Sequence, residues 1–386
     1  MQIGVPKETA EGERRVALVP DVVRKLTRPP GEGEAPENEI VVQRGAGAGA
    51  LIPDEQYEEA GAKLVDGPDA VYAADVVVKV APPSAEEIAR LGPDTVLIGF
   101  LSPLTNGEGV RAIAESGATS FALESVPRIS RAQSMDALSS QSNVAGYRSA
   151  LIGAQELGRF YPMLMTAAGT IRPATVLVLG AGVAGLQAIA TARRLGAVVQ
   201  GFDVRAAVKE QVESLGATFL EFDLGEDLEG AGGYARELTA EQQARQQELM
   251  AEAIGRVDVV ITTALVPGRR APILVTEQAV KLMKSGSVIV DLAGEQGGNC
   301  ELSEPGKTVT VHDVKIAAPL NVPSTMAEHA SQLYARNIEA LLGLMIKDGK
   351  LELNFDDEVI AGACITRDKE IVNEGAKQAA GATTPS

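Results

Sequence analysis

The feature that most constrains this chain is a glycine-rich turn, Gly-Ala-Gly-Val-Ala-Gly at residues 180–185. The apolar run before it, Thr175–Leu179, predicts a buried strand, and the apolar spacing after it predicts a helix. The next predicted strand, Val198–Phe202, ends at Asp203, which lies 23 residues after Gly180. A strand, a G-x-G-x-x-G turn, a helix and an acid at the end of the next strand together make a dinucleotide-binding βαβ unit.

Each part of this unit has a physical role. Gly180 permits the tight turn, Gly182 lets the backbone approach a pyrophosphate, and Gly185 lets the helix pack closely on the strand. The helix N-terminus offers unpaired N–H groups to the phosphates. Asp203 would accept hydrogen bonds from ribose hydroxyls, so we expect NAD(H) rather than NADP(H), although Arg205 could receive a 2′-phosphate. The alternative is a glycine turn without a ligand.

Strand and helix patterns alternate in two blocks, which predicts an α/β fold of two Rossmann-like domains with parallel sheets. In the first block, up to about Ser125, apolar runs such as Ile3–Val5 alternate with helical segments such as Asp21–Leu26. The second block opens at Thr175. Residues 28–39 read as an exposed loop, and a helix is expected over residues 138–160.

The end of the chain predicts a return to the first domain. Ser324 is expected to be the N-cap of a long helix that runs to about Ile346, after a sheet that looks finished. We therefore expect a discontinuous N-terminal domain of residues 1–137 and 325–386, with an NAD(H)-binding domain of residues 138–324 inserted in it. This division also draws on the family resemblance given below.

Composition excludes several classes of protein. The formal net charge of −17 opposes binding to nucleic acid phosphates or anionic lipids. Cys300 and Cys364 are the only cysteines and form no C-x-x-C, so neither a metal site nor a disulfide framework is expected. No signal-peptide pattern and no apolar stretch of about 20 residues are present, so we expect a soluble, cytoplasmic chain.

Proton-transfer chemistry has few candidate residues. Hydride transfer to a keto or imino acid also moves a proton, and histidine is the side chain most often used for it. The two histidines are His312, in an expected hairpin over Val309–Val314, and His329, on the last helix. Both are expected at a surface or interface. No H-E-x-x-H, G-x-S-x-G or P-loop occurs either. A hydride acceptor that needs no proton, such as a second nicotinamide ring, fits this composition.

Several long motifs resemble one family. They are RISRAQSMD (128–136), SSQSNVAGYR (139–148), TAAGT (166–170), GVAGLQAIATA (182–192) and DVRAAVKEQVESLGA (203–217). With them, residues 1–367 resemble the alpha subunit of proton-translocating NAD(P) transhydrogenase, and more specifically its soluble NAD(H)-binding domain I.

This resemblance implies a cofactor held in the cleft between two α/β domains. It also implies a homodimer, an NADP(H)-binding beta subunit and a membrane-spanning subunit as partners. The implied activity is Re/Si-specific, reversible hydride transfer between NADH and NADP⁺ held on the partner, coupled to proton translocation. The chain would then be a separate first polypeptide, peripheral on the inner face of the cell membrane and with little activity alone.

The resemblance also assigns residues. The family's cleft loop maps onto Arg128, Gln133, Asp136 and Ser139, which are expected to hold the nicotinamide carboxamide and ribose as the catalytic set. The alternatives are a helix N-cap for Asp136 and a solvated ion pair for Arg128. Residues 230–235 match the family's mobile loop, which would close over the adenosine, or they form an exposed linker.

The expected cofactor-binding residues comprise the βαβ unit, the mobile-loop tyrosine and a strand end at the carboxyl edge of the sheet. They are Gly180, Gly182, Val183, Ala184, Gly185, Asp203, Val204, Arg205, Tyr234, Thr263, Ala264 and Leu265. For Thr263–Leu265, a simple strand end is equally consistent with the sequence.

Alanine dehydrogenase is the alternative family. Residues 5–20, Lys79 and residues 291–298 resemble it, and Arg15 and Lys79 match its carboxylate-gripping residues. Ser102 stands where that family has its catalytic histidine, and Glu295 where it has aspartate. Loss of the histidine argues against amino-acid oxidation. A third hypothesis is a sensor that binds NADH without turnover.

Overall fold

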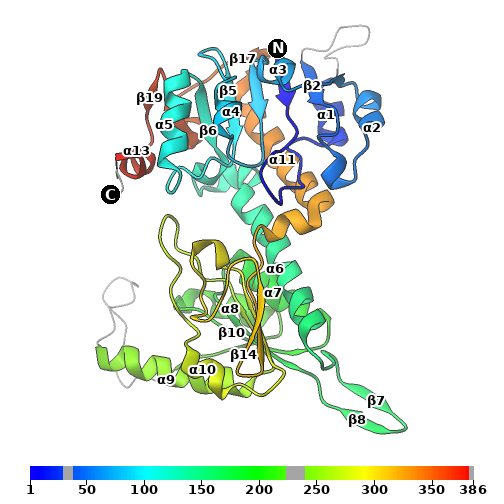
Figure 1. The fold of residues 1–386 in the computed structure, drawn as a ribbon, viewed down its shortest axis with the longest axis vertical. Coiled ribbons are helices and arrows are strands. Elements are labelled where there is room, and N and C mark those ends of the chain that lie inside the picture. The colour runs from blue at the N-terminus through cyan, green and yellow to red at the C-terminus, as the bar shows by residue number, and fades with distance from the viewer. Residues whose placement is uncertain (29–37, 223–239, 382–386) are drawn as a thin grey trace. The chain divides into compact units, whose positions relative to one another are not determined.

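The chain packs as two compact units in a computed structural model that describes residues 1–28, 38–222 and 240–381. Unit 1 comprises Met1–Gln141 and Pro323–Ser386, and unit 2 comprises Ser142–Val322 (Figure 1). Each unit is an α/β sandwich with its own sheet and cores. The assignment of these units as functional domains stays a prediction.

Unit 1 is built on an eight-stranded sheet in the order β19-β18-β6-β5-β4-β1-β2-β3. Its strands are β1 (Gln2–Val5), β2 (Glu39–Gln43), β3 (Lys63–Val65), β4 (Val76–Val78), β5 (Val96–Gly99), β6 (Thr119–Ala122), β18 (Cys364–Arg367) and β19 (Glu370–Ile371). The six N-terminal strands pair in parallel. The two C-terminal strands add antiparallel at one edge, so the sheet is mixed but mostly parallel.

Alternating side chains of the buried strands pack into two cores in unit 1, one on each face of the sheet. Val76, Val78 and Ile98 face one core, while Val77 and Leu97 face the other, as the two-residue period of a strand requires. The first core is covered by α1 (Pro20–Leu26), α2 (Asp54–Glu59), α11 (Ala327–Met345) and α12 (Glu358–Ala363). The second is covered by α3 (Asp69–Tyr72), α4 (Ala85–Ile88), α5 (Gly107–Ser116) and α13 (Glu374–Gly381).

Unit 2 has a seven-stranded sheet in the order β11-β10-β9-β12-β13-β15-β14. Its strands are β9 (Thr175–Leu179), β10 (Val198–Phe202), β11 (Thr218–Phe219), β12 (Val259–Thr262), β13 (Val288–Asp291), β14 (Thr308–Val311) and β15 (Val314–Ala317). All neighbours are parallel except β14 and β15, which form the hairpin expected around His312. His312 and Asp313 both have positive φ, as a two-residue hairpin turn requires.

Helices cover both faces of the unit 2 sheet. One core contains residues of α6 (Ala137–Glu156), α7 (Val183–Arg194) and α8 (Lys209–Ser214), and the other contains residues of α9 (Ala240–Arg256) and α10 (Glu277–Leu282). The strand order changes direction at β9, with β10 on one side and β12 on the other. In such sheets, ligands bind at the carboxyl ends of the strands beside this switch point.

Some local expectations differ from the structure. Ser324 is not the N-cap of α11. Its hydroxyl donates to the Gly12 carbonyl and accepts from the Arg14 N–H, while a short 3₁₀ turn, Val322–Met326, leads into the helix. The helix expected over residues 138–160 ends at Glu156. Of the expected loop at residues 28–39, Glu39 is instead the first residue of β2, and residues 29–37 lie outside the described residues.

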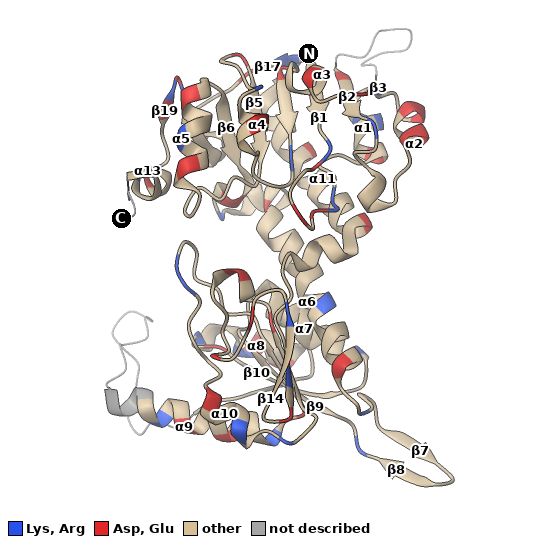
Figure 2. Cartoon of the chain, in the orientation of Figure 1, with Lys and Arg blue, Asp and Glu red and all other residues tan. Residues whose placement is uncertain are grey.

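A separate hairpin, β7 (Leu164–Thr166) with β8 (Gly169–Ile171), extends away from the rest of unit 2 (Figure 1). The TAAGT motif at residues 166–170 forms its tip. In the ranges that the structure describes, no helix is both long and apolar enough to cross a bilayer. Acidic side chains are spread over the elements of both units rather than gathered in one block (Figure 2).

Candidate functional site

The glycine turn lies at the carboxyl end of β9, at the switch point of the unit 2 sheet. Gly180 has a φ of +98°, a conformation that strains any residue with a side chain. Its N–H donates to the Phe202 carbonyl at 2.8 Å, which joins the turn to the end of β10. A Cβ at this position would lie 2.7 Å from the Thr263 hydroxyl oxygen. The turn therefore requires glycine here for both backbone and space.

Gly185 sets the distance between α7 and β9. A Cβ on this residue would lie 1.8 Å from the Gly180 carbonyl oxygen, so only glycine lets the helix start this close to the strand. A second close approach fixes the same end of the helix, because a Cβ on Gly146 of α6 would lie 2.1 Å from the Ala184 carbonyl oxygen. The N-terminus of α7 is thus held by two glycine contacts.

Gly182 differs from the other two motif glycines. It is the N-cap of α7 with ordinary extended backbone, and no described atom other than its chain neighbours lies within 4 Å of the Cβ it could carry. Packing and φ do not explain glycine here. A ligand that approaches the backbone does explain it, because a bare Cα leaves room for phosphate oxygens at the helix N-terminus. The turn therefore fits a dinucleotide pyrophosphate, although the ligand itself stays a prediction.

Asp203 follows β10 and its carboxylate is nearly buried, with 7% of the side chain exposed. It accepts hydrogen bonds from the Ala181 N–H at 2.7 Å and from the Arg205 N–H, Nε and Nη2 at 2.9 Å each. Burial opposes ionisation, but the hydrogen bonds from Arg205 and Ala181 outweigh it and hold the pKa of Asp203 below its ordinary value. Asp203 therefore carries its charge at neutral pH.

This pairing refines the predicted contact with ribose. Both carboxylate oxygens of Asp203 already accept two hydrogen bonds, so ribose hydroxyls can bind only if the Arg205 side chain turns away. The Arg205 side chain is 60% exposed and free to do so. Val204 between them is 72% exposed and makes no core contact. Tyr234 and the expected mobile loop at residues 230–235 lie outside the described residues.

Thr263 and Ala264 lie beside the glycine turn, at the end of β12. The Thr263 hydroxyl donates to the Gly180 carbonyl at 3.0 Å, and its N–H donates to the Leu179 carbonyl at 2.9 Å. Leu265, the next residue along, is 49% exposed. The structure thus brings together the two parts of the predicted cofactor site, the glycine turn and the Thr263–Leu265 strand end.

Asn299, which was not identified from the sequence, fixes this strand end. It is fully buried; its amide oxygen accepts from the Ala264 N–H at 3.1 Å, and its amide nitrogen donates to the Ala264 and Pro272 carbonyls at 2.8 Å. Asp291, also fully buried, accepts from the Cys300 N–H at 2.9 Å and so fixes the segment that follows Asn299. Nothing in the spacing of these two residues along the sequence pointed to this role.

The expected catalytic loop lies in unit 1, on a 3₁₀ turn, Ser130–Met135, and at the start of α6. Asp136 accepts from the Ser139 N–H at 2.9 Å and from the Ser139 hydroxyl at 2.5 Å, so it caps α6, as the alternative interpretation held. Arg128 and Gln133 are exposed. Arg131, not Arg128, forms the ion pair that anchors this loop, with Asp357 at 2.7 Å. A role of this loop toward the nicotinamide stays a prediction.

The cations that match alanine dehydrogenase are buried and already paired. Arg15 contacts the Glu13 carboxylate at 2.6 Å and the Gln141 amide oxygen at 2.9 Å. The Lys79 ammonium lies 3.1 Å from Glu8 and 2.9 Å from Glu87, and 1% of its side chain is exposed. A substrate carboxylate would have to displace these internal carboxylates.

Ser102, at the position of that family's histidine, follows β5 with a φ of +52°. Its N–H and that of Leu101 donate to the same oxygen of Glu124, at 2.6 and 2.9 Å. The second carboxyl oxygen of Glu124 is buried with no hydrogen-bond partner in the described structure. Burial raises the pKa of Glu124 to about 7 against the opposing effect of these N–H donors. Glu124 is thus a weak acid beside Ser102 that the sequence did not single out.

The histidines lie where the sequence suggested. The His312 ring, in the β14–β15 turn, pairs with Glu277 at 3.1 Å, and His329 is an exposed residue of α11. Neither is buried at the carboxyl edge of a sheet.

Comparisons with known proteins agree on one family. Models described as alanine dehydrogenase/PNT, N-terminal domain and C-terminal domain, match residues 4–145 and 149–374. The first part of NAD(P) transhydrogenase subunit alpha from Rhodospirillum rubrum is 50% identical over 383 residues, which cover 97% of this chain and 98% of that protein. The crystal structure of transhydrogenase from Sinorhizobium meliloti matches with a TM-score of 0.83 and 44% identity, over 97% of this chain and 99% of that one. Alanine dehydrogenase of Mycobacterium tuberculosis is 35% identical over 336 residues, 84% of this chain and 82% of that protein.

Proposed function

The chain belongs to the alanine dehydrogenase/PNT family, and we propose that it is the NAD(H)-binding subunit of an NAD(P) transhydrogenase. In this proposal it exchanges a hydride reversibly between NADH, bound at the glycine turn of unit 2, and NADP⁺ held on a partner subunit. Its relatives with the higher identities are transhydrogenase alpha subunits, while alanine dehydrogenase is a more distant relative.

Gly182 carries the proposal of a dinucleotide site, and Asp203 the choice of NAD(H). Gly182 has no side chain at a position where neither φ nor packing requires glycine. It is the N-cap of α7, a helix whose N-terminal end is fixed by close contacts at Gly185 and Gly146. A helix N-terminus with open space before it suits a pyrophosphate. The charge of Asp203 at the end of β10 disfavours a 2′-phosphate, which supports NAD(H) over NADP(H).

The residues of this chain would act by binding and positioning. Bound NADH supplies the hydride, and the acceptor ring on the partner needs no proton. The chain therefore needs no general acid at the reacting carbon. What it must supply is placement, because hydride transfer requires reacting atoms about 3–3.5 Å apart. The Thr263–Leu265 strand end, clamped by Asn299, is suited to hold the cofactor in one place.

Amino-acid oxidation is the second candidate, and the unit 1 geometry weighs against it. The cations that would hold a substrate carboxylate, Arg15 and Lys79, are buried against Glu13, Glu8 and Glu87. Ser102 stands where a proton-transferring histidine is needed. Both features weigh against amino-acid oxidation.

A homodimer is the assembly we propose, through hairpin β7–β8. An isolated two-stranded hairpin is only marginally stable in water. This one carries no charged residue (Figure 2), and Met165 and Ile171 on it are 73% and 48% exposed. A second copy of the same chain would cover this apolar surface.

We further propose two partner subunits, an NADP(H)-binding beta subunit and a membrane-spanning subunit. They bring the chain to the inner face of the cell membrane and couple hydride transfer to proton translocation.

Reconstitution tests the proposed function. The chain is mixed with its NADP(H)-binding partner, and reduction of an NADP⁺ analogue by NADH is followed spectroscopically. Hydride exchange that requires both proteins supports the proposal. Alanine-dependent NAD⁺ reduction by the chain alone would support the second candidate instead, and NADH binding without turnover in the presence of the partner would leave only a nucleotide sensor.

A further inference from the structure

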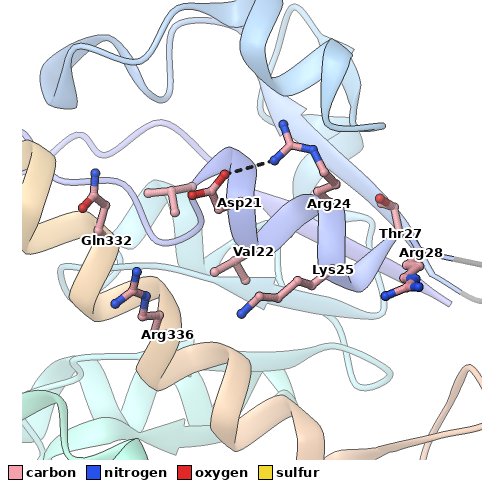
Figure 3. Close-up of a pocket in the computed structure, with 9 residues that line it drawn as sticks. Asp21, Val22, Arg24, Lys25, Thr27, Arg28, Gln332 and Arg336 are labelled. Carbon is pink, nitrogen blue, oxygen red and sulfur yellow. Dashed lines mark hydrogen bonds and ion pairs between the residues drawn. The ribbon is translucent and has the colours of Figure 1, made fainter.

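Unit 1 contains a groove that the proposed function does not use. It lies between α1 and α11 and has a volume of about 730 Å³ (Figure 3). Cavities of roughly 300–1,000 Å³ are typical of sites for small molecules. Val19 and Val22, both buried, belong to its lining.

The groove is basic in an acidic protein. Arg24, Lys25, Arg28 and Arg336 line it, whereas the whole chain carries a formal net charge of −17. Asp21 is the one carboxylate among the lining residues that the structure describes. Arg28 and Arg336 are 308 residues apart in sequence, so the fold alone brings these cations to one space.

Two of these cations are available to a ligand. Arg24 pairs with Asp21 at 3.0 Å, and the Lys25 ammonium lies 2.9 Å from the Glu339 carboxylate. Within the described ranges, neither Arg28 nor Arg336 forms an ion pair or a side-chain hydrogen bond. Unpaired guanidinium groups present several donors in a fixed plane, which matches the oxygens of a phosphate.

The arrangement of the cations favours an anion between them. Figure 3 shows Lys25 reaching from α1 toward Arg336 of α11, with Val22 between their helices and Arg28 at the far end of the groove. The Lys25 ammonium already pairs with Glu339, so the charge left for a ligand is that of Arg28 and Arg336. Cations distributed along the groove suit a ligand with several negative charges better than a single carboxylate.

We propose that the groove between α1 and α11 binds a small molecule that carries more than one phosphate group. Arg336 contacts one phosphate and Arg28 contacts another. This site lies within unit 1 and is separate from the glycine turn of unit 2, so it does not rest on the proposed function.

Binding of tripolyphosphate to the full chain, measured by calorimetry at low and at moderate salt, tests this proposal. We expect saturable binding that Arg336→Gln weakens about tenfold, and that weakens as salt rises because the contacts are exposed and ionic. The matched control is Arg172→Gln, which removes an exposed arginine from unit 2 and should leave the affinity unchanged. Because Arg336 is exposed, thermal melting of its variant should match the unmodified chain.

Three outcomes would overturn the proposal. Equal loss of affinity in Arg172→Gln and Arg336→Gln would mean that tripolyphosphate binds by general charge alone. Loss of tripolyphosphate binding when NADH saturates the chain would place the anion at the glycine turn. Finally, Arg336-dependent binding to phosphatidylglycerol vesicles, without binding of tripolyphosphate, would assign the groove to lipid headgroups rather than to a free phosphorylated molecule.

Discussion

Replacing Gly182 and Gly185 by alanine, one at a time, should separate ligand binding from folding. The two residues are three positions apart in the same turn, yet their surroundings differ. A Cβ on Gly182 meets no described atom within 4 Å, whereas a Cβ on Gly185 would lie 1.8 Å from the Gly180 carbonyl oxygen. The same chemical change is therefore expected to have opposite main effects.

For Gly182→Ala, the expected loss is in affinity. The added methyl group occupies the space through which phosphate oxygens reach the N–H groups of α7. Loss of one such charge-assisted hydrogen bond costs about 2–3 kcal/mol, which is a factor of roughly 30–150 in the Kd for NADH. The free energy of unfolding should change by no more than about 0.5 kcal/mol, because nothing in the fold is displaced.

For Gly185→Ala, the expected loss is in stability. Relief of the overlap moves α7 away from β9 by more than about 1 Å, and overpacking of this kind costs about 1–3 kcal/mol. For a domain of this size, that lowers the Tm by roughly 2–4 °C per kcal/mol. Binding of NADH should fall too, because the moved helix carries the phosphate donors.

The assays are NADH titration by fluorescence and thermal unfolding, applied to both variants and to the unmodified chain. Unchanged NADH affinity in Gly182→Ala would refute the placement of the pyrophosphate at this turn. Equal destabilisation of the two variants would refute the interpretation of Gly182 as free of packing constraint.

Three further changes test other regions of the structure. Asn299→Ala releases the Ala264 backbone, so NADH affinity should fall about tenfold, whereas the exposed-site control Ser214→Ala should bind normally in the same titration. Glu124→Gln should remove a pH dependence of stability. Burial raises the pKa of Glu124 to about 7 in the folded chain. Its contribution to the free energy of unfolding is therefore fully present below its unfolded pKa and is lost as pH rises through 7, by up to roughly 3 kcal/mol. Denaturant unfolding at pH 5 and pH 8 should show this loss in the unmodified chain and not in Glu124→Gln. Met165→Asp in the β7–β8 hairpin should shift sedimentation from dimer to monomer, while Leu51→Asp, at an equally exposed position of unit 1, should not. If both variants stay dimeric, or both become monomeric, the hairpin is not the interface.

Much of the fold follows from local apolar patterns. The bounds expected for β9 and β10 match the structure, because each is a short apolar run closed by glycine or aspartate. The antiparallel additions β18 and β19 carry no such signal of direction, whereas the β14–β15 hairpin was expected. The apolar pattern of a strand indicates that it is buried. Its direction depends instead on which end of the sheet the preceding connection reaches.

Local signals also compete at segment ends. Ser324 has the residue type of an N-cap, but tertiary hydrogen bonds to Gly12 and Arg14 claim its hydroxyl, so α11 begins three residues later. Hairpin β7–β8 was missed because its strands are three residues long and are exposed on almost every side. The hydrogen bonds of Ser324 join residues more than 300 positions apart, so a window of neighbouring residues does not contain them.

The candidate site divides in the same way. The glycine motif and Asp203 could be identified because their spacing is set by one βαβ unit. The hydrogen bonds that fix this unit could not be identified from the sequence. Asn299 bonds to Ala264 across 35 residues, and the bond from Arg205 to Asp203 depends on the conformation of the Arg205 side chain. Asp136 shows the limit of a motif, because its contacts in the structure are those of a helix cap.

Isotope transfer tests the central claim, that this chain holds one half of a direct hydride relay, most directly. NADH deuterated at the transferred position of C4 is mixed with the chain, its NADP(H)-binding partner and NADP⁺ in ordinary water, and the NADPH formed is analysed by mass spectrometry. The account predicts that the deuterium is retained in NADPH, and that Gly182→Ala slows its appearance in proportion to the lost NADH affinity. NADPH without deuterium, or labelled NADPH formed equally fast when this chain is left out, would contradict it.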